Sequence, residues 1–202
     1  MNYLAHLLLA GPAPAYRLGG LLGDFVKGPL PGQLAEPLAA GVALHRSIDV
    51  FADEPPAFLA SRARVSALRR RYSGIMVDMF YDHFLAARWS EFSDQALPDF
   101  ANDTYTLLRA NQTVLPERLA QILPHMQQYD WLTSYREVAS ITRAIDNMAT
   151  RRLSRPNPMV GGGEELIEQY QGFEADFLAF WPDVLHHSEQ WRRAYTRNGL
   201  PL

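Results

Sequence analysis

The sequence contains no cysteine among its 202 residues. This absence excludes disulfide bonds, thiolate zinc sites and cysteine nucleophiles, and it fits a reducing compartment, so we expect a cytoplasmic protein. A long apolar run is also missing. Residues 1–17 are apolar, but they lack a basic start, include His6 and break at Gly11-Pro12. Such a segment is too short to span a bilayer and is poorly built as a signal peptide, so we expect no membrane partner.

A strong charge of either sign is absent as well. The chain has 19 basic and 22 acidic residues, for a net charge of -3. This balance predicts affinity neither for bulk nucleic acid nor for membrane surfaces. The 48% of hydrophobic and 20% of charged residues are typical of a globular protein. Because no repeat, low-complexity tract or shift in composition divides the chain, we expect a single domain over residues 1–202.

Strand signals are missing too, and helical patterns fill most of the chain. No run alternates apolar and polar residues with β-branched enrichment, and no Asn-Gly or Asp-Gly hairpin stands between two such runs. The sequence therefore predicts an all-α fold. The expected helices cover residues 2–10, about 37–51, 57–72, 73–89, 97–111, 116–130 and 133–151, with one or two more over 164–197 around a break at Trp181-Pro182.

The segment Ser73–Trp89 is the most informative of these helices. Its sequence is apolar on nearly every face, which is the pattern of a buried helix. Yet it carries Asp78, Asp82 and His83, with no lysine or arginine between them. Carboxylates are rarely buried unless they are paired or bind a metal. The segment therefore indicates a cation site.

Several other histidines and carboxylates lie in apolar surroundings in the first 83 residues. His45 and Asp49 are four residues apart, so they share one face of a helix, as do Asp78 and Asp82. Histidine and aspartate without thiolate suit Mn²⁺, Mg²⁺ or Fe²⁺ at least as well as Zn²⁺, and facing helices can each contribute ligands. The candidate residues are His6, Asp24, His45, Asp49, Asp78, Asp82 and His83.

Structural roles remain open for the same residues. His45 could accept a hydrogen bond from a neighbour, and Asp49 could pair with Arg46. We interpret the other histidines, His125, His186 and His187, as exposed residues.

Motifs of competing chemistries are missing. The sequence contains no GxSxG, no GxGxxG between a strand and a helix, no phosphate-binding loop ending in Gly-Lys-Ser/Thr, and no HExxH. A serine nucleophile would need a histidine beside Ser47 or Ser73, and the sequence offers Ser47 only His45 of the same helix.

Five short segments follow one another in an order that is specific. They are MNYLAHLLLA at 1–10, LLGDFVKG at 21–28, HRSIDVFAD at 45–53, VDMFYDHFLAARW at 77–89 and DNMATRR at 146–152. Together they resemble the acyl carrier protein phosphodiesterase (ACP hydrolyase) family. The resemblance implies an all-helical domain that is distantly related to HD-domain metal-dependent phosphohydrolases. The usual His-Asp dyad of those relatives occurs here only in reverse order, as Asp82-His83.

The resemblance also implies an activity. Members of the family use Mn²⁺ to hydrolyse the phosphodiester that joins 4′-phosphopantetheine to a serine of holo acyl carrier protein, which yields the apo protein. Mg²⁺ or another divalent ion is an alternative. Two other interpretations stay open: an HD-like phosphohydrolase that acts on a nucleotide or another small phosphoester, and a non-catalytic helical binding module.

For the metal-dependent reaction we expect the following roles. The metal ligands are Asp24, His45, Asp78 and Asp82, and the catalytic residues are His6, Asp24, His83 and Arg46. A bound metal would activate water, His6 or His83 would protonate the serine alkoxide, and Arg46 would hold a phosphoryl oxygen. Asn2 would orient His6 or a ligand.

An acidic carrier protein requires a basic surface for docking. The sequence offers two groups of arginines for this purpose. The first lies on the helix expected over 57–72 and comprises Arg62, Arg69, Arg70 and Arg71, and the second comprises Arg143, Arg151, Arg152 and Arg155.

Overall fold

The computed structural model describes residues 1–151 and 157–197, and within these ranges it contains helices and no strand. The prediction of an all-α fold is confirmed. The α-helices are α1 (Tyr3–Leu9), α2 (Pro14–Leu22), α3 (Glu36–Ala52), α4 (Pro56–Arg64), α5 (Ser73–Ala87), α6 (Leu97–Ala110), α7 (Glu117–Gln128), α8 (Trp131–Ser134), α9 (Val138–Arg151), α10 (Gly163–Glu168) and α11 (Tyr170–Arg197). Short 3₁₀ segments are η1 (Ala67–Tyr72), η2 (Trp89–Glu91) and η3 (Gln112–Val114).

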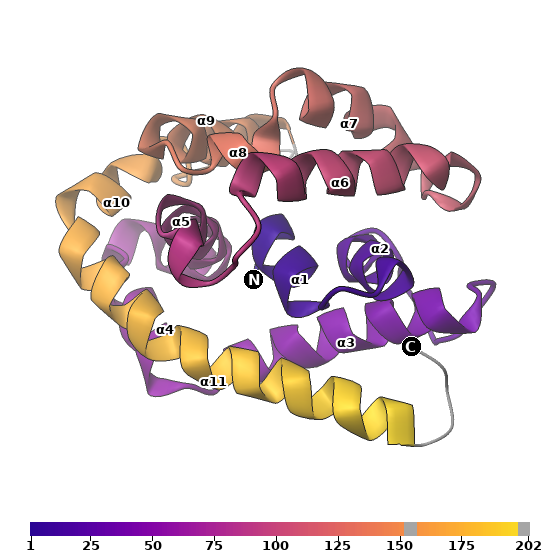
Figure 1. The fold of residues 1–202 in the computed structure, drawn as a ribbon. Helices are drawn as coiled ribbons and strands as arrows, with labels where there is room; N and C mark the ends of the chain where they lie inside the picture. The colour runs from indigo at the N-terminus through magenta and orange to yellow at the C-terminus, as the bar shows by residue number, and fades with distance from the viewer. Residues whose placement is uncertain (152–156, 198–202) are drawn as a thin grey trace.

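Helix α1 lies in the middle of the molecule. Figure 1 shows it enclosed by α5, by α2 and α3, by the long α11, and by the layer of α6 to α9. Helix α1 is seven residues long, too short to be stable alone in water, and its buried residues pack against this surrounding shell. The position of α1 therefore depends on tertiary contacts.

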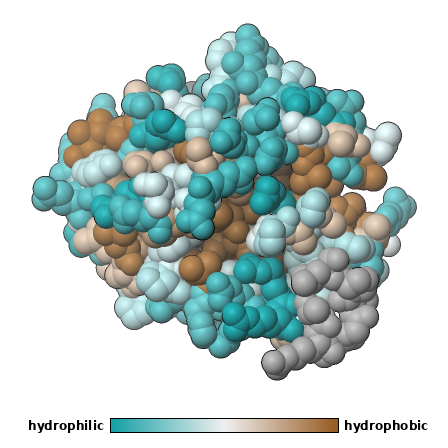
Figure 2. All heavy atoms as spheres, in the orientation of Figure 1, coloured by the Kyte–Doolittle hydropathy of each residue, from teal (hydrophilic) through white to brown (hydrophobic). Residues whose placement is uncertain are grey.

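The outer surface is mostly hydrophilic. Figure 2 shows hydrophobic side chains mainly in a hollow near the centre of the face and in smaller patches on either side. Within the described part of the chain, no helix combines the length and the apolar character that crossing a bilayer requires.

Helix α5 is buried as its sequence predicts. Asp82 is fully buried and His83 is 2% exposed. The Asp82 carboxylate accepts hydrogen bonds from the backbone N–H groups of Leu4 (2.8 Å) and Ala5 (3.0 Å). These are first-turn amides of α1, which lack partners within their own helix, and the side chain of the N-cap residue Asn2 does not cap them. Asp82 thus fixes the start of α1 from a neighbouring helix.

Helices α2 and α3 pack closely because glycines face each other where they cross. A Cβ atom added at Gly41 would lie 2.6 Å from the carbonyl oxygen of Tyr16, and one added at Gly19 would collide with the carbonyl of Leu38. At the end of α2, a Cβ atom on Gly23 would collide with the ring of His45. The glycines therefore bring the end of α2 against His45.

Two of the expected helices are interrupted. The single helix expected over 57–72 is divided into α4, which ends at Arg64, and the 3₁₀ segment η1, which begins at Ala67. The cause is a long-range contact: the N–H and hydroxyl of Ser66 both bind the carboxylate of Glu165, at 2.9 and 2.5 Å. The helix expected over 133–151 is likewise divided between α8 and α9.

The break expected at Trp181-Pro182 was wrong. Helix α11 runs from Tyr170 to Arg197 through Pro182. A proline inside a helix costs about 3 kcal/mol because it removes one hydrogen bond and crowds the preceding turn. Here the ring of Pro182 is exposed, while Trp181 and Val184 are buried in the core. Burial of the flanking side chains offsets the cost of the proline.

Replacing Asp82 by alanine should destabilise the fold. We expect the free energy of unfolding to fall by about 2 kcal/mol or more, because two buried N–H groups lose their acceptor. Urea denaturation measures this change. Asp53→Ala is the control, since Asp53 forms only an exposed ion pair with Arg62 and should change stability by less than about 1 kcal/mol. Equal effects of the two substitutions would contradict the assignment of Asp82 as a helix cap.

Candidate metal centre

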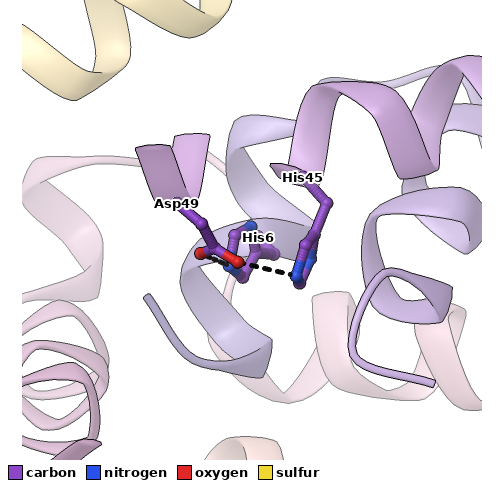
Figure 3. A group of neighbouring side chains, drawn as sticks. All are labelled: His6, His45 and Asp49. Carbon is purple, nitrogen blue, oxygen red and sulfur yellow. Dashed lines mark ion pairs between the residues drawn. The ribbon is translucent and has the colours of Figure 1, made fainter. Parts of the chain in front are cut away.

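His6 of α1 and His45 and Asp49 of α3 converge on one point. His6 Nε2 lies 3.0 Å from Asp49 Oδ1, and His45 Nε2 lies 3.1 Å from Asp49 Oδ2. The two imidazole rings stack with their centroids 3.7 Å apart. Figure 3 shows the carboxylate facing both rings. One potential ligand atom from each residue lies within 4.8 Å of the others, so one cation can contact all three.

The orientation of His45 suits a metal ligand. Its Nδ1 atom lies 2.7 Å from the carbonyl oxygen of Gly20. A carbonyl can only accept a hydrogen bond, so Nδ1 carries a proton and Nε2 is the nitrogen that faces Asp49. Metal-binding histidines are commonly fixed in this way, through a hydrogen bond from the nitrogen that does not face the metal. The close packing of Gly23 against the ring restricts it further.

His6 is buried without satisfied nitrogens. Burial, together with the nearby His45 ring, lowers the pKa of His6 to about 3, so its imidazole is neutral at neutral pH. Neither of its ring nitrogens has a hydrogen-bond partner in the structure, although Nε2 points to Asp49. Buried polar atoms seldom lack partners. A cation beside Asp49 would give Nε2 of His6 a partner.

Asp49 supplies the negative charge of the cluster. Burial acts to raise the pKa of Asp49, but the two histidines outweigh this effect and hold the pKa well below its ordinary value. The side chain is 46% exposed, so the cluster is open to solvent on this side. A carboxylate that faces two imidazole nitrogens is a set of donors that suits a divalent cation.

Two more predicted ligands, Asp78 and Asp24, lie near the cluster. Asp78 Oδ1 is 2.9 Å from the backbone amine of Met1, and that amine is 3.4 Å from Asp49 Oδ1. Burial raises the pKa of Asp78, and the charges of Asp49 and Asp24 act in the same direction. Asp24 is exposed in the turn after α2. The carboxylates of Asp24, Asp49 and Asp78 thus concentrate negative charge on one side of the two histidines.

The remaining predicted catalytic residues make other contacts. His83 uses both ring nitrogens, one with the Tyr135 carbonyl (2.9 Å) and one with the Tyr170 hydroxyl (3.0 Å). Arg46 donates to the carbonyls of Gly28 (2.8 Å) and Val26 (3.1 Å). The structure thus joins His83 to the helices around it and Arg46 to the loop that follows Asp24.

The arginines expected to dock a partner divide into two kinds. Arg69 donates to the buried carboxylate of Glu165 at 3.0 Å and to backbone carbonyls, so it holds the core together. Arg62, Arg70 and Arg71 are at the surface or close to it. Arg143 is exposed on α9. Outside the described residues or side chains lie Arg151, Arg152 and Arg155.

One histidine that we interpreted as exposed makes a contact between two helices. His187 is half-buried, stacks on Phe51 at a centroid distance of 4.3 Å, and lies with Nε2 2.9 Å from the hydroxyl of Ser47. Ser47 therefore does meet a histidine other than His45. The partners are 140 residues apart, so no local spacing could indicate the contact. It joins α11 to α3.

Gly23→Ala should weaken metal binding. The added methyl group collides with the His45 ring and displaces Nε2 from the cluster. We expect the dissociation constant for Mn²⁺ to rise at least tenfold, the scale on which loss of ligand orientation acts. Isothermal titration calorimetry measures the constant, and circular dichroism checks the fold.

The matched control is Gly74→Ala, where the added methyl group meets no atom within 4 Å. It should bind Mn²⁺ like the wild type. A folded Gly23→Ala variant with unchanged affinity would show that His45 is not a ligand.

Comparison with known proteins identifies the family. The family model described as acyl carrier protein phosphodiesterase matches residues 1–184. Relatives of that name include proteins from Yersinia enterocolitica (33% identical over 190 residues, 94% of this chain and 98% of the relative), Photorhabdus laumondii (32%, 94% and 96%) and Escherichia coli O45:K1 (32% over 195 residues, 94% and 98%). No solved structure matches significantly, so the relation to HD domains stays a prediction. The chain belongs to the acyl carrier protein phosphodiesterase family.

Proposed function

We propose that this protein hydrolyses the phosphodiester between 4′-phosphopantetheine and the serine of holo acyl carrier protein, and that it does so in the cytoplasm with a divalent metal. The products are the apo carrier protein and free 4′-phosphopantetheine. Family membership supports the phosphodiesterase activity. The observation that carries the metal dependence is the convergence of His6, His45 and Asp49 around one point.

The donor set favours Mn²⁺, with Mg²⁺ or another divalent ion as the alternative. Two imidazoles and a carboxylate, with no thiolate, match the ligands of such ions. The Nε2 atoms of His6 and His45 both face Asp49, at 3.0 and 3.1 Å, so a cation beside Asp49 can contact both. Two further carboxylates, Asp24 and Asp78, would complete the site. When bound, the metal supplies a lowered pKa for water and charge stabilisation at the phosphoryl oxygens.

The side chains of the protein have distinct tasks in this proposal. His45 and Asp49 hold the reacting centre from α3, and His6 closes it from α1. Asp24, exposed at the opening of the site, orients the attacking water or takes its proton. The serine alkoxide needs a proton when it leaves. His6 does not supply it in this proposal, because its ring is neutral and its Nε2 faces the cation. Solvent water at the exposed side of Asp49 is the source instead.

We revise the roles expected for three other residues. Asp82 positions α1, and so His6, through its bonds to Leu4 and Ala5. Arg46 positions the loop after Asp24 through two backbone carbonyls. His83 has both nitrogens occupied by Tyr135 and Tyr170, which gives it a structural role.

Turnover of holo carrier protein tests the proposal directly. With Mn²⁺ present, mass spectrometry should show the carrier protein lose its 4′-phosphopantetheine group, and a chelator should abolish the loss. His45→Ala and Asp49→Ala should lower kcat at least 100-fold, because each removes a ligand from a three-residue cluster. The exposed His186 lies outside that cluster, so His186→Ala is the control. Turnover that persists in chelator would refute metal dependence, and hydrolysis of nucleotides alone would favour the HD-like alternative.

Surface arginines should affect binding of the acidic carrier protein. Reversing the charge at Arg70 and Arg71 should raise KM for the carrier protein several-fold at low salt, with kcat unchanged and a smaller effect at high salt. Arg69→Glu should instead destabilise the fold, because it places a second carboxylate beside buried Glu165. Kinetics at two salt concentrations and urea denaturation separate the two effects. An unchanged KM at low salt would remove Arg70 and Arg71 from the docking surface.

A further inference from the structure

A cavity of about 700 Å³ lies between the start of α1, α5 and the layer formed by α7, α8 and α9. Its volume falls within the range of about 300–1,000 Å³ that small-molecule sites span. We propose that this cavity receives the 4′-phosphopantetheine arm of the carrier protein during hydrolysis. The proposal rests on the proposed function, and it assigns a binding site to residues with no role in the metal centre.

The inner wall of the cavity adjoins the metal centre. Asn2 and Met79 line this wall and contact each other, with Asn2 Nδ2 3.0 Å from Met79 Sδ. Asn2 follows Met1, whose amine contacts Asp78 and Asp49, and Met79 follows Asp78. Two residues that line the cavity are therefore the direct sequence neighbours of Met1 and Asp78, which contact each other beside the centre. A phosphodiester held at the centre can therefore extend one of its two substituents into the cavity.

The walls match the chemistry of the pantetheine arm. That arm alternates short alkyl segments with amide groups, so its site requires apolar surface interrupted by hydrogen-bonding side chains. Apolar surface comes from Met79, Ile122, Trp131 and Met148, and polar groups come from Ser134, Ser140 and Asn147. Most of these residues lie on α7 to α9, whose chemistry the metal centre does not use.

The charge of the cavity also suits this occupant. Among the described residues that line it, none is acidic, and Arg118, His125 and Arg143 stand on its exposed side. Arg143 donates to the hydroxyl of Ser140 at 2.9 Å, which holds the guanidinium at the wall. A second cavity, of about 420 Å³ beside Phe51, carries the carboxylates of Glu54 and Asp183. The pantetheine arm is uncharged beyond its phosphate, but the carrier protein that delivers it is acidic, so a cavity with basic residues on its exposed side is better matched than one with carboxylates.

Filling the cavity tests the proposal. Ala144 lines it from α9, so Ala144→Phe places a ring in the path of the arm. Ala139→Phe is the matched control, since Ala139 is exposed on the same helix and does not line the cavity. Asn147→Phe is a second blocking variant at an exposed lining position, where a larger side chain displaces no core atoms.

The readout is binding to the Mn²⁺-loaded protein, measured by calorimetry with 4′-phosphopantetheine and with inorganic phosphate. The wild type and Ala139→Phe should bind 4′-phosphopantetheine at least tenfold more tightly than phosphate. At least one folded blocking variant should lose that advantage and keep its affinity for phosphate. Equal affinity of the wild type for the two ligands, or an unchanged advantage in both blocking variants, would overturn the assignment, as would tighter binding of a nucleoside monophosphate.

Turnover of holo carrier protein by the wild type separates this proposal from the one on which it rests. If the wild type releases 4′-phosphopantetheine but both blocking variants retain the binding advantage, the function stands and the cavity assignment fails. If the wild type does not release it, the proposed function itself fails.

Discussion

The carboxylate of Asp49 faces the Nε2 atoms of two stacked, buried imidazoles. The positions of the surrounding helices determine this arrangement. The bond from Nδ1 of His45 to the Gly20 carbonyl turns Nε2 toward Asp49, and burial keeps the ring of His6 neutral beside it. The two Nε2 atoms lie 3.0 and 3.1 Å from the carboxylate, close enough for ring protons or a cation to join the three groups. A divalent cation would contact all three groups at once.

The arrangement requires two short helices to be held firmly. Helix α1 carries His6 and is too short to be stable without its neighbours, and Asp82 fixes its first turn. Helix α2 carries the carbonyl that orients His45, and the close contact of Gly19 and Gly41 fixes it against α3. A helix cap and a glycine contact, neither of them a part of the reaction, therefore decide the geometry of the centre.

The sequence allowed much of the fold to be predicted, because helix periodicity is a local property. The buried character of α5 follows from its apolar residues, and the shared face of His45 and Asp49 follows from their spacing. The sequence did not show which faces would meet. It assigned both acids of α5 to a metal, whereas the structure places Asp78 near the cluster and directs Asp82 to the amides of α1.

Other features depended on contacts between distant segments. The contact of Ser47 with His187 joins residues 140 positions apart, and the division of the helix after Arg64 depends on Glu165. Arg69, one of a run of three arginines, is internal because the same carboxylate lies beside it. No periodicity within a single helix carries this information, since it arises only when the helices pack.

The most direct test of the account is the anomalous scattering of Mn²⁺ in a crystal of this protein. We predict a peak within coordination distance of His6 Nε2, His45 Nε2 and the Asp49 carboxylate, with Asp82 still bound to the amides of α1. A structure with Mn²⁺ elsewhere, or with Asp49 turned away from both histidines while manganese is present, would contradict it.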